Sequence, residues 1–133
     1  MKKNEEYIVT CIDDTDLNSG VVKIDDMVVF VPNLLIGEKA KIKIVKVNKK
    51  YAFGIITQLL KPSINRQELT CEVAKTCGGC QLQHMKYAYQ LDYKYKHVKK
   101  LFEDIEVKSI LGMDSPWYYR NKAQFPVKIK DGK

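Results

Sequence analysis

The sequence lacks the features that mark membrane, secreted or large catalytic proteins. Its 133 residues amount to about one domain or two very small modules, which excludes a large enzyme. No apolar run approaches the ~20 residues that span a bilayer, and the N-terminus has acids where a signal peptide needs an apolar stretch. With 45% apolar and 29% charged residues, the composition is not that of a disordered chain. We therefore expect a folded, cytoplasmic protein without a membrane partner.

Arginine is scarce, with two arginines against 21 lysines. Arginine supplies the bidentate fork that reads guanine, so we expect little base-specific readout. The positive charge is also uneven: residues 1–60 hold 9 basic and 8 acidic side chains, and residues 61–133 hold 14 and 8. A basic second half suits a polyanion such as RNA or DNA, because neutralised phosphates release counterions. Charge alone equally fits a plain solvated lysine surface.

Residues 1–60 show the pattern of short β-strands. Segments rich in valine and isoleucine alternate with turn formers such as Asp25-Asp26. The five expected strands cover residues 6–12, 21–24, 27–31, 40–47 and 52–58. Five short strands cannot form two good sheets, but they can close into a small OB-like barrel. Lys41, Lys43 and Lys46 alternate with isoleucine and valine, so we expect one buried face and one row of ammonium groups, which either bind RNA or are merely solvated.

After the barrel the pattern changes twice. Pro62 marks the exit from the barrel. From Lys86, apolar residues recur every three or four positions, which predicts an amphipathic helix with a lysine-rich polar face. Residues 107–111 and 117–129 are again strand-like, and Asp131-Gly132 is a hairpin signal whose returning strand is absent. We therefore expect a truncated chain. The alternative is that these residues are the irregular C-terminal tail of a complete small protein.

The expected fold class is therefore mainly β with one helix (α+β). Residues 1–60 form a small five-stranded OB-like barrel and residues 61–85 a cysteine-cluster loop. Residues 86–104 form a basic amphipathic helix. Residues 105–133 begin a truncated β central domain with the start of a β-hairpin.

Three of the four cysteines form a compact group. Cys71, Cys77 and Cys80 are spaced C-x5-C-G-G-C, and in a cytoplasmic chain this favours metal binding over structural disulfides. The glycines between the last two let the backbone turn its N–H groups toward the thiolates. A [4Fe-4S] cluster would need a fourth thiolate from outside this chain, whereas zinc could take His84 as its fourth ligand. The spacing fits either, and reduced or redox-active thiols are the remaining alternative.

The other cysteine and histidine have simpler interpretations. Cys11 lies among apolar residues of the first expected strand, so we interpret it as an ordinary buried thiol. His97 lies in mid-helix among lysines, where we expect a solvated surface histidine.

Four segments stand out together. They are Val28-Val29-Phe30-Val31-Pro32 with Gly37-Glu38, the cysteine segment extended to Gln81-Leu82-Gln83-His84, Tyr87-x2-Gln90-Leu91-x2-Lys94, and Tyr119-Arg120-Asn121-Lys122-Ala123-Gln124-Phe125. In type and order they resemble the N-terminal part of the S-adenosylmethionine-dependent RNA uracil-5-methyltransferases, the family that modifies ribosomal and transfer RNA, and in particular the 23S rRNA type. The resemblance covers nearly the whole chain.

The resemblance implies a fold and a cofactor. Residues 1–60 would be a TRAM domain, an OB-like RNA-binding barrel. Cys71, Cys77 and Cys80 would ligate a [4Fe-4S] cluster whose fourth cysteine lies further along a full-length chain, which favours iron-sulfur over zinc. In the family this cluster is structural or positions RNA, so no redox catalysis is implied.

The resemblance also implies what this chain lacks. Full-length members add a thiolate to uracil C6, transfer a methyl group to C5 and remove the C5 proton with a general base. The cofactor-binding domain, the catalytic cysteine and the base have no counterpart here, and no G-x-G-x-x-G occurs. We therefore expect no catalytic residues and no activity in this chain alone, and S-adenosylmethionine binding only in the full-length protein.

RNA contact is the function that this portion can retain. Arg120, Asn121, Lys122 and Gln124 combine phosphate binders with amides that read base edges, beside aromatic rings that stack on unpaired bases. The alternative is that the aromatic rings belong to the hydrophobic core and that the polar face is exposed to solvent without binding RNA. The leading hypothesis is thus an RNA-recognition and cluster-bearing portion of an RNA methyltransferase, with ribosomal RNA as the expected RNA and no obligate protein partner. The alternatives are a stand-alone RNA-binding module and a zinc-stabilised Cys3His interaction module.

Overall fold

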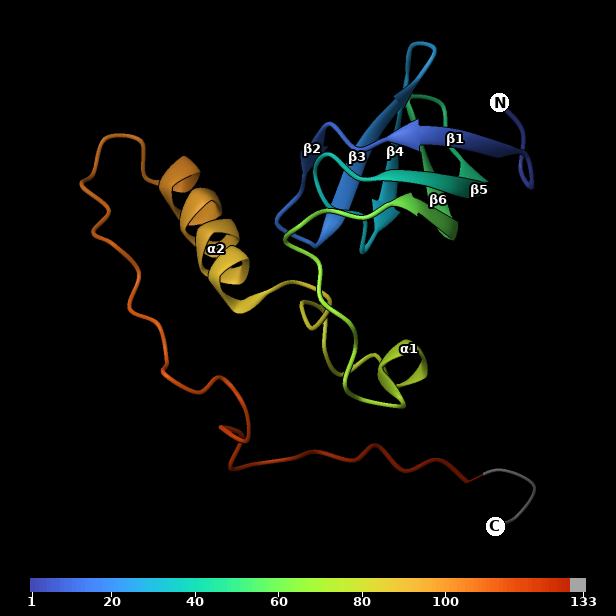
Figure 1. Ribbon diagram of the computed structural model, residues 1–133. Helices are drawn as coiled ribbons and strands as arrows, with labels where there is room; N and C mark the ends of the chain where they lie inside the picture. The colour runs from blue at the N-terminus through green and yellow to red at the C-terminus, as the bar shows by residue number, and fades with distance from the viewer. Residues whose placement is uncertain (130–133) are drawn as a thin grey trace.

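The computed structural model describes residues 1–129, and its N-terminal half is one curved sheet of six strands (Figure 1). The strands are β1 (Glu6–Thr10), β2 (Asp13–Asp14), β3 (Ser19–Ile24), β4 (Met27–Pro32), β5 (Lys39–Val47) and β6 (Tyr51–Lys61). Their spatial order is β1-β5-β6-β4-β3-β2. Neighbours are antiparallel except β4 and β6, which are parallel. This sheet, with one long helix, confirms the expected mainly β, OB-like fold.

The sheet has one strand more than expected. The sixth is β2, whose Asp13 and Asp14 pair with Val21 and Gly20 of β3. Its acidic residues are typical turn formers, so the sequence favours a loop there. Gly20 permits the close approach of the chain, because a Cβ at this position would collide with the Leu34 carbonyl oxygen and the Cys11 sulfur.

The core of the barrel comes from alternating residues of the strands. In β5, Ile42 and Ile44 are fully buried, while Lys41 and Lys43 lie half-buried on the opposite face, as the alternation predicts. Cys11 is also buried, and its burial raises the pKa of its thiol to about 11. The interpretation of Cys11 as a buried core thiol is therefore confirmed.

The helix α2 (Tyr87–Leu101) lies beside the barrel and packs on it through Tyr93 (Figure 1). Tyr93 is 6% exposed and forms a second apolar cluster with Leu35 and Met85. Its hydroxyl donates a hydrogen bond to the Thr15 carbonyl oxygen and accepts one from the Asn18 N–H. The helix is thus anchored to the β2–β3 loop of the barrel, which fixes the position of its N-terminal half.

His97 also contributes to this contact, so the expectation of a solvated surface histidine is wrong. Its Nε2 lies 3.1 Å from an Asp14 carboxylate oxygen, and its side chain is only 15% exposed. The ring packs edge-on against Tyr93, with centroids 4.6 Å apart. Lys96 lies 3.0 Å from the same carboxylate oxygen. The acidic strand β2 therefore faces one side of an otherwise basic helix.

A buried carboxylate connects the barrel to the segment that follows it. Glu38 is fully buried, and its carboxylate accepts hydrogen bonds from the Leu35 and Ser63 N–H groups and from the Arg66 guanidinium at 2.6 and 2.7 Å. Burial alone would raise the pKa of Glu38, but these hydrogen bonds and the Arg66 charge outweigh it and lower the pKa. Arg66 in turn pairs through its backbone with Met85, just before α2.

Residues 102–129 have no helix or strand, so the strands expected at residues 107–111 and 117–129 are wrong for this structure. The chain runs back along α2, held by hydrogen bonds from the Tyr95 hydroxyl to the Val107 carbonyl and from the Met113 N–H to the Tyr87 hydroxyl (Figure 1). A strand needs a neighbouring ladder, and none of the described strands lies beside this segment. The hairpin turn expected at Asp131-Gly132 lies outside the described residues.

No helix among the described residues combines the length and the apolar character needed to cross a membrane.

Candidate nucleic-acid interface

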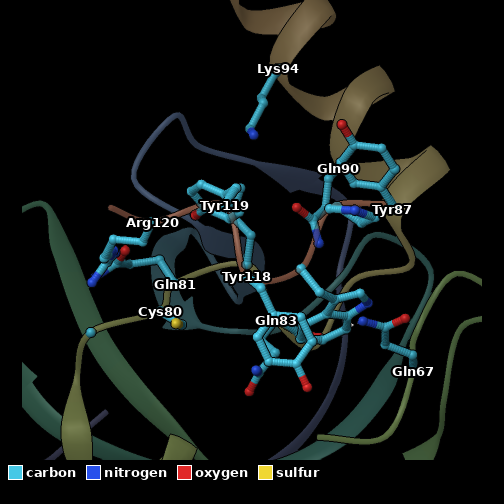
Figure 2. A pocket seen from close by; sticks show the side chains of 14 residues that line it. Gln67, Cys80, Gln81, Gln83, Tyr87, Gln90, Lys94, Tyr118, Tyr119 and Arg120 are labelled. Carbon is cyan, nitrogen blue, oxygen red and sulfur yellow. Dashed lines mark hydrogen bonds between the residues drawn. The ribbon is translucent and has the colours of Figure 1, made fainter. Parts of the chain in front are cut away.

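A cleft of about 450 Å³ opens where three segments meet (Figure 2). One wall is the loop over residues 79–83 and the second is the N-terminal half of α2. The third wall is the segment over residues 116–120, and Gln67 also lines the cleft. These walls belong to three of the segments that carry the family resemblance, so residues far apart in the sequence meet in one site.

The loop wall is fixed to the barrel and to the segment before it. Asn18 donates its side-chain N–H to the Gln81 carbonyl oxygen. Gln67 binds the loop twice, through its N–H to the His84 carbonyl and through its side chain to the Gln83 carbonyl at 2.8 Å. Asn18 adopts the left-handed conformation, with φ of 57°, which asparagine tolerates better than most residues. Hydrogen bonds from Asn18 and Gln67 therefore hold the backbone of this loop in place.

The helical wall consists of Tyr87, Gln90 and Lys94, which point toward the cleft (Figure 2). Their spacing of three and four places them on one face of α2. The Gln90 side chain donates to the Met85 carbonyl oxygen at 3.0 Å, where the chain enters the helix. The sequence indicated Gln90 and Lys94 only through the family segment, whereas Gln67 carried no signal.

The third wall supplies aromatic rings and a guanidinium group. Trp117 and Tyr119 are 44% and 65% exposed, and Arg120 lies at the end of this wall, near Gln81 (Figure 2). The rings are therefore available to a ligand, which excludes their assignment to a core in the described chain. The lining residues include lysine and arginine but no carboxylate, so the cleft suits an anionic ligand with a flat apolar part.

The expected RNA contacts divide into three groups. Arg120 lines the cleft, and a shallower hollow next to it is lined by Arg120, Lys122 and Gln124. Asn121 is exposed in the same segment and lines neither hollow. Lys41 and Lys43 lie on β5 outside the cleft, and the Lys41 ammonium is 2.6 Å from the Glu6 carboxylate.

The three thiols that are close in the sequence lie in one exposed segment. Cys71, Cys77 and Cys80 are exposed and free, and Cys80 also lines the cleft. The short helix α1 (Ala74–Cys77) ends at Gly78 in the left-handed conformation, and a Cβ on Gly79 would lie 3.3 Å from the Cys77 sulfur. Glycine thus leaves room beside this thiol. Within residues 1–129 no three cysteine, histidine or acidic side chains converge on one point, so the structure does not bring the three thiols together.

His84 lies in a different environment from the thiols. It is 5% exposed, and its Nε2 has no hydrogen-bond partner among the described residues. Burial, and then the charge of Arg66, lower the pKa of His84 to about 4. These features describe a neutral buried histidine, and nothing in the described chain favours it as a ligand together with the cysteines.

Comparisons with known proteins agree with this architecture. Residues 3–57 match the family model of the TRAM domain. An uncharacterized RNA methyltransferase of Halalkalibacterium halodurans is 44% identical over 99% of this chain, and one of Oceanobacillus iheyensis is 46% identical over 99%. The chain spans 30% of the length of each of these relatives.

A solved structure gives a further likeness. It is that of the Pyrococcus abyssi tRNA (uracil-54, C5)-methyltransferase in complex with S-adenosyl-L-homocysteine, 26% identical, with a TM-score of 0.48 over 71% of this chain and 21% of that one. The relatives and the TRAM match confirm the predicted TRAM domain and the predicted resemblance to RNA methyltransferases. The chain thus carries a TRAM domain and is homologous, over nearly its whole length, to a portion of RNA methyltransferases.

Proposed function

We propose that this chain is the RNA-recognition and [4Fe-4S]-binding N-terminal portion of an S-adenosylmethionine-dependent RNA uracil-5-methyltransferase that acts on ribosomal RNA. The observation that supports this best is the cleft, where the cysteine loop, α2 and the Tyr119-Arg120 segment meet. Because the chain spans 30% of its relatives, methyl transfer is assigned to a longer protein. RNA binding is the part of the function that this chain performs.

The chemistry of the cleft fits single-stranded RNA. Lys94 and Arg120 provide positive charge for the phosphate backbone, and Trp117 and Tyr119 provide faces on which unpaired bases stack. The lysines of β5 add positive charge on the barrel, outside the cleft, although Lys41 is partly neutralised by Glu6. The expected mode is therefore electrostatic attachment along the strand with base stacking at the cleft.

The three cysteine sulfurs of the loop are the type of ligand that an iron-sulfur cluster requires. Its three thiols are unpaired and exposed, and glycine leaves space next to the Cys77 sulfur. A cluster would accept these thiolates and tie Cys71, Cys77 and Cys80 to one centre. The protein's own contribution would be to orient the loop whose last cysteine lines the cleft.

The RNA proposal is tested with Arg120→Ala combined with Lys122→Ala. Loss of two phosphate contacts should weaken binding of single-stranded RNA and reduce the slope of log K against log salt by roughly 1.4. The control is Lys99→Ala with Lys100→Ala, which removes the same charge from the last turn of α2. Fluorescence anisotropy at several salt concentrations measures both. An unchanged affinity and slope in the first pair would refute the RNA role of this segment.

The cluster proposal is tested by iron, acid-labile sulfide and zinc per chain after anaerobic purification, with an absorbance spectrum. About four iron and four sulfide per chain support the cluster, and Cys77→Ser should lower both values. Cys11→Ala, which removes the buried thiol of the barrel, is the control and should leave them unchanged. About one zinc without sulfide would instead support the Cys3His module.

A further inference from the structure

We propose that the outer face of the barrel carries a second RNA-binding surface, which stacks unpaired bases on three aromatic rings and holds phosphates with the lysines of the β5–β6 hairpin. We call the rings of Phe30, Tyr51 and Phe53 the aromatic platform. None of them lines the cleft, so this surface is a separate site. The inference rests on the proposed RNA-binding function and adds to it a second place of contact on the same chain.

The aromatic platform lies on the face of the sheet that points away from the core. Phe30 and Phe53 are partners across β4 and β6, and Tyr51 comes two residues before Phe53, so the three side chains share one face. Their ring centroids are 5.5 to 5.9 Å apart. Tyr51 is 40% exposed, and none of the three belongs to the hydrophobic core of the described barrel. Core packing therefore does not account for this group of rings.

The β5–β6 hairpin concentrates the positive charge of the protein. Residues 39–61 contain seven lysines and no acidic residue, whereas the rest of the chain is balanced, with 16 basic and 16 acidic side chains. The hairpin charge thus equals the net charge of +7 of the whole chain. Lysines often protect the open edge of a sheet, but β5 and β6 lie inside it, between β1 and β4 (Figure 1). Edge protection therefore does not explain them.

Two of these lysines lie beside the platform on the same face of the sheet. Lys46 is the partner of Phe53 across β5 and β6, and Lys43 is the partner of Ile55. Partners across neighbouring strands point to the same side of a sheet. Acidic side chains also lie at this end of the barrel, in the Asp25-Asp26 turn before β4, but no ion pair joins them to a hairpin lysine in the described chain. The ammonium groups therefore stay available to phosphates.

The turn of the hairpin adds further positive charge. Lys49 and Lys50 are exposed and lead directly into Tyr51, the first residue of β6. Among the seven hairpin lysines, only Lys41 has a carboxylate partner within residues 1–129, which is Glu6. The platform thus has free cations both along β5 and at the turn.

Rings bordered by free ammonium groups are typical of a surface for single-stranded RNA. Every base has a π-face, so stacking on an aromatic ring accepts any base, and lysines attract the phosphates without reading sequence. In a duplex the bases are stacked on one another and cannot reach the rings. The platform should therefore prefer a single strand to a duplex and should discriminate little among bases.

The platform and the cleft can hold one RNA strand together. Tyr51 is the first residue of β6 and Lys61 the last, and the segment that leads to the cleft follows Lys61. A strand of 11 residues is about 35 Å long, so the two sites lie toward opposite ends of β6. An RNA that reaches both makes its second contact at high effective concentration. A long strand should therefore bind more tightly than a short one.

The ring contact is tested by Tyr51→Leu, which keeps an apolar side chain but removes the ring. Fluorescence anisotropy of the whole chain compares an oligouridine of about twenty nucleotides with an RNA duplex of the same length. The variant should bind the oligouridine about tenfold more weakly, because a stacked base is lost, and should bind the duplex with unchanged affinity. The control is Phe102→Leu, a ring that is 47% exposed and lies outside the cleft and the platform, which should change neither affinity. Circular dichroism verifies the fold of each variant.

The phosphate contact is tested by Lys49→Ala combined with Lys50→Ala, two exposed side chains of the hairpin turn. Loss of two phosphate contacts should reduce the slope of log K against log salt for the oligouridine by roughly 1.4. The control is again Lys99→Ala with Lys100→Ala, at the last turn of α2, which should keep the slope of the wild type.

Three results would overturn the second surface. Unchanged affinity in Tyr51→Leu would exclude the aromatic platform, and an unchanged slope in the lysine variant would exclude the phosphate contacts of the hairpin turn. Equal losses for oligouridine and duplex in Tyr51→Leu would exclude base stacking. If Arg120→Ala with Lys122→Ala still weakens binding in these cases, the proposed function stands without the platform. Absence of binding of the wild type to both RNAs would contradict the proposed function itself, and the inference with it.

Discussion

The barrel and the segment over residues 102–129 contain similar apolar residues, but these side chains are buried in the barrel and exposed in the segment. Valine and isoleucine on the inner face of the barrel are buried, and Val29 and Ile42 are fully so. In the segment, Phe125, Val127 and Ile129 are exposed. The barrel strands pair with one another, whereas the segment has no ladder beside it in the described chain. Apolar composition therefore predicts burial only where the chain itself supplies a partner surface.

Between these extremes lies the connection from residues 61 to 101. It has little core of its own, and hydrogen bonds of buried polar groups fix it to the barrel. Glu38 and Arg66 make one such contact, and Tyr93 makes another with the β2–β3 loop. The position of the cleft thus depends on a few polar contacts as much as on apolar packing.

The largest expected effect comes from Glu38→Ala, which leaves the Arg66 guanidinium without its buried partner. Breaking a buried pair in this way costs about 3 to 5 kcal/mol of the free energy of unfolding. The control is Glu6→Ala, whose exposed pair with Lys41 should contribute less than about 1 kcal/mol. Urea unfolding measures both. Equal effects of the two substitutions would show that the buried Glu38–Arg66 pair contributes no more to the free energy of unfolding than an exposed pair.

The contrast between barrel and segment is tested by Ile42→Ala and Ile129→Ala. Ile42 is fully buried, so its truncation leaves a cavity and should cost about 2 to 5 kcal/mol. Ile129 is 77% exposed, and its truncation should change the free energy of unfolding by less than about 0.5 kcal/mol. A large loss with Ile129→Ala would mean that the segment is packed in solution.

Buried His84 should make stability depend on pH. Its pKa in the folded chain is lowered to about 4 from 6.5, so the unfolded chain takes up the proton first. Stability should therefore fall as the pH drops from about 6.5 to about 4, by roughly 3 kcal/mol. Urea titrations across this range on the wild type and on His84→Asn test this. The same pH dependence in the variant would assign it to other groups.

A smaller effect is expected from Tyr93→Phe, which keeps the ring in its cluster but removes the hydroxyl that bonds Thr15 and Asn18. The loss should be about 1 kcal/mol, because the Asn18 N–H then keeps only its 3.2 Å hydrogen bond to the Thr15 carbonyl oxygen. Tyr118→Phe, at an exposed ring, is the control and should have no measurable effect. Hydrogen exchange of α2 should rise in the first variant alone, and unchanged exchange would show that this hydroxyl does not hold the helix.

The fold could be predicted where local pattern and burial agree. The alternation in β5, with Ile42 and Ile44 inside and lysines outside, placed both the strand and its buried face. The two-residue strand β2 could not be found, because Asp13 and Asp14 are turn formers that pair only once β3 lies next to them. Strand-like alternation in residues 117–129 was misleading, since strand formation depends on a partner that sequence pattern does not reveal.

The candidate site was predictable in its parts but not in its assembly. Arg120 was identified from its residue type and aromatic neighbours, and Gln90 and Lys94 from the family segment. Gln67 had no signal, because its role follows from a hydrogen bond to a loop sixteen residues away. The second arginine, Arg66, serves the fold rather than RNA, and only the burial of Glu38 shows this. The [4Fe-4S] cluster on the cysteines stays a prediction.

The central claim is that RNA lies in the cleft between the cysteine loop, α2 and residues 116–120. Ultraviolet crosslinking of the whole chain to a single-stranded RNA decamer, followed by mass spectrometry of the peptides, tests it directly. The expected crosslinks join the RNA to Trp117, Tyr119 or Tyr87, the rings that line the cleft. Crosslinks confined to barrel aromatics such as Tyr51, with none in the cleft, would contradict the claim.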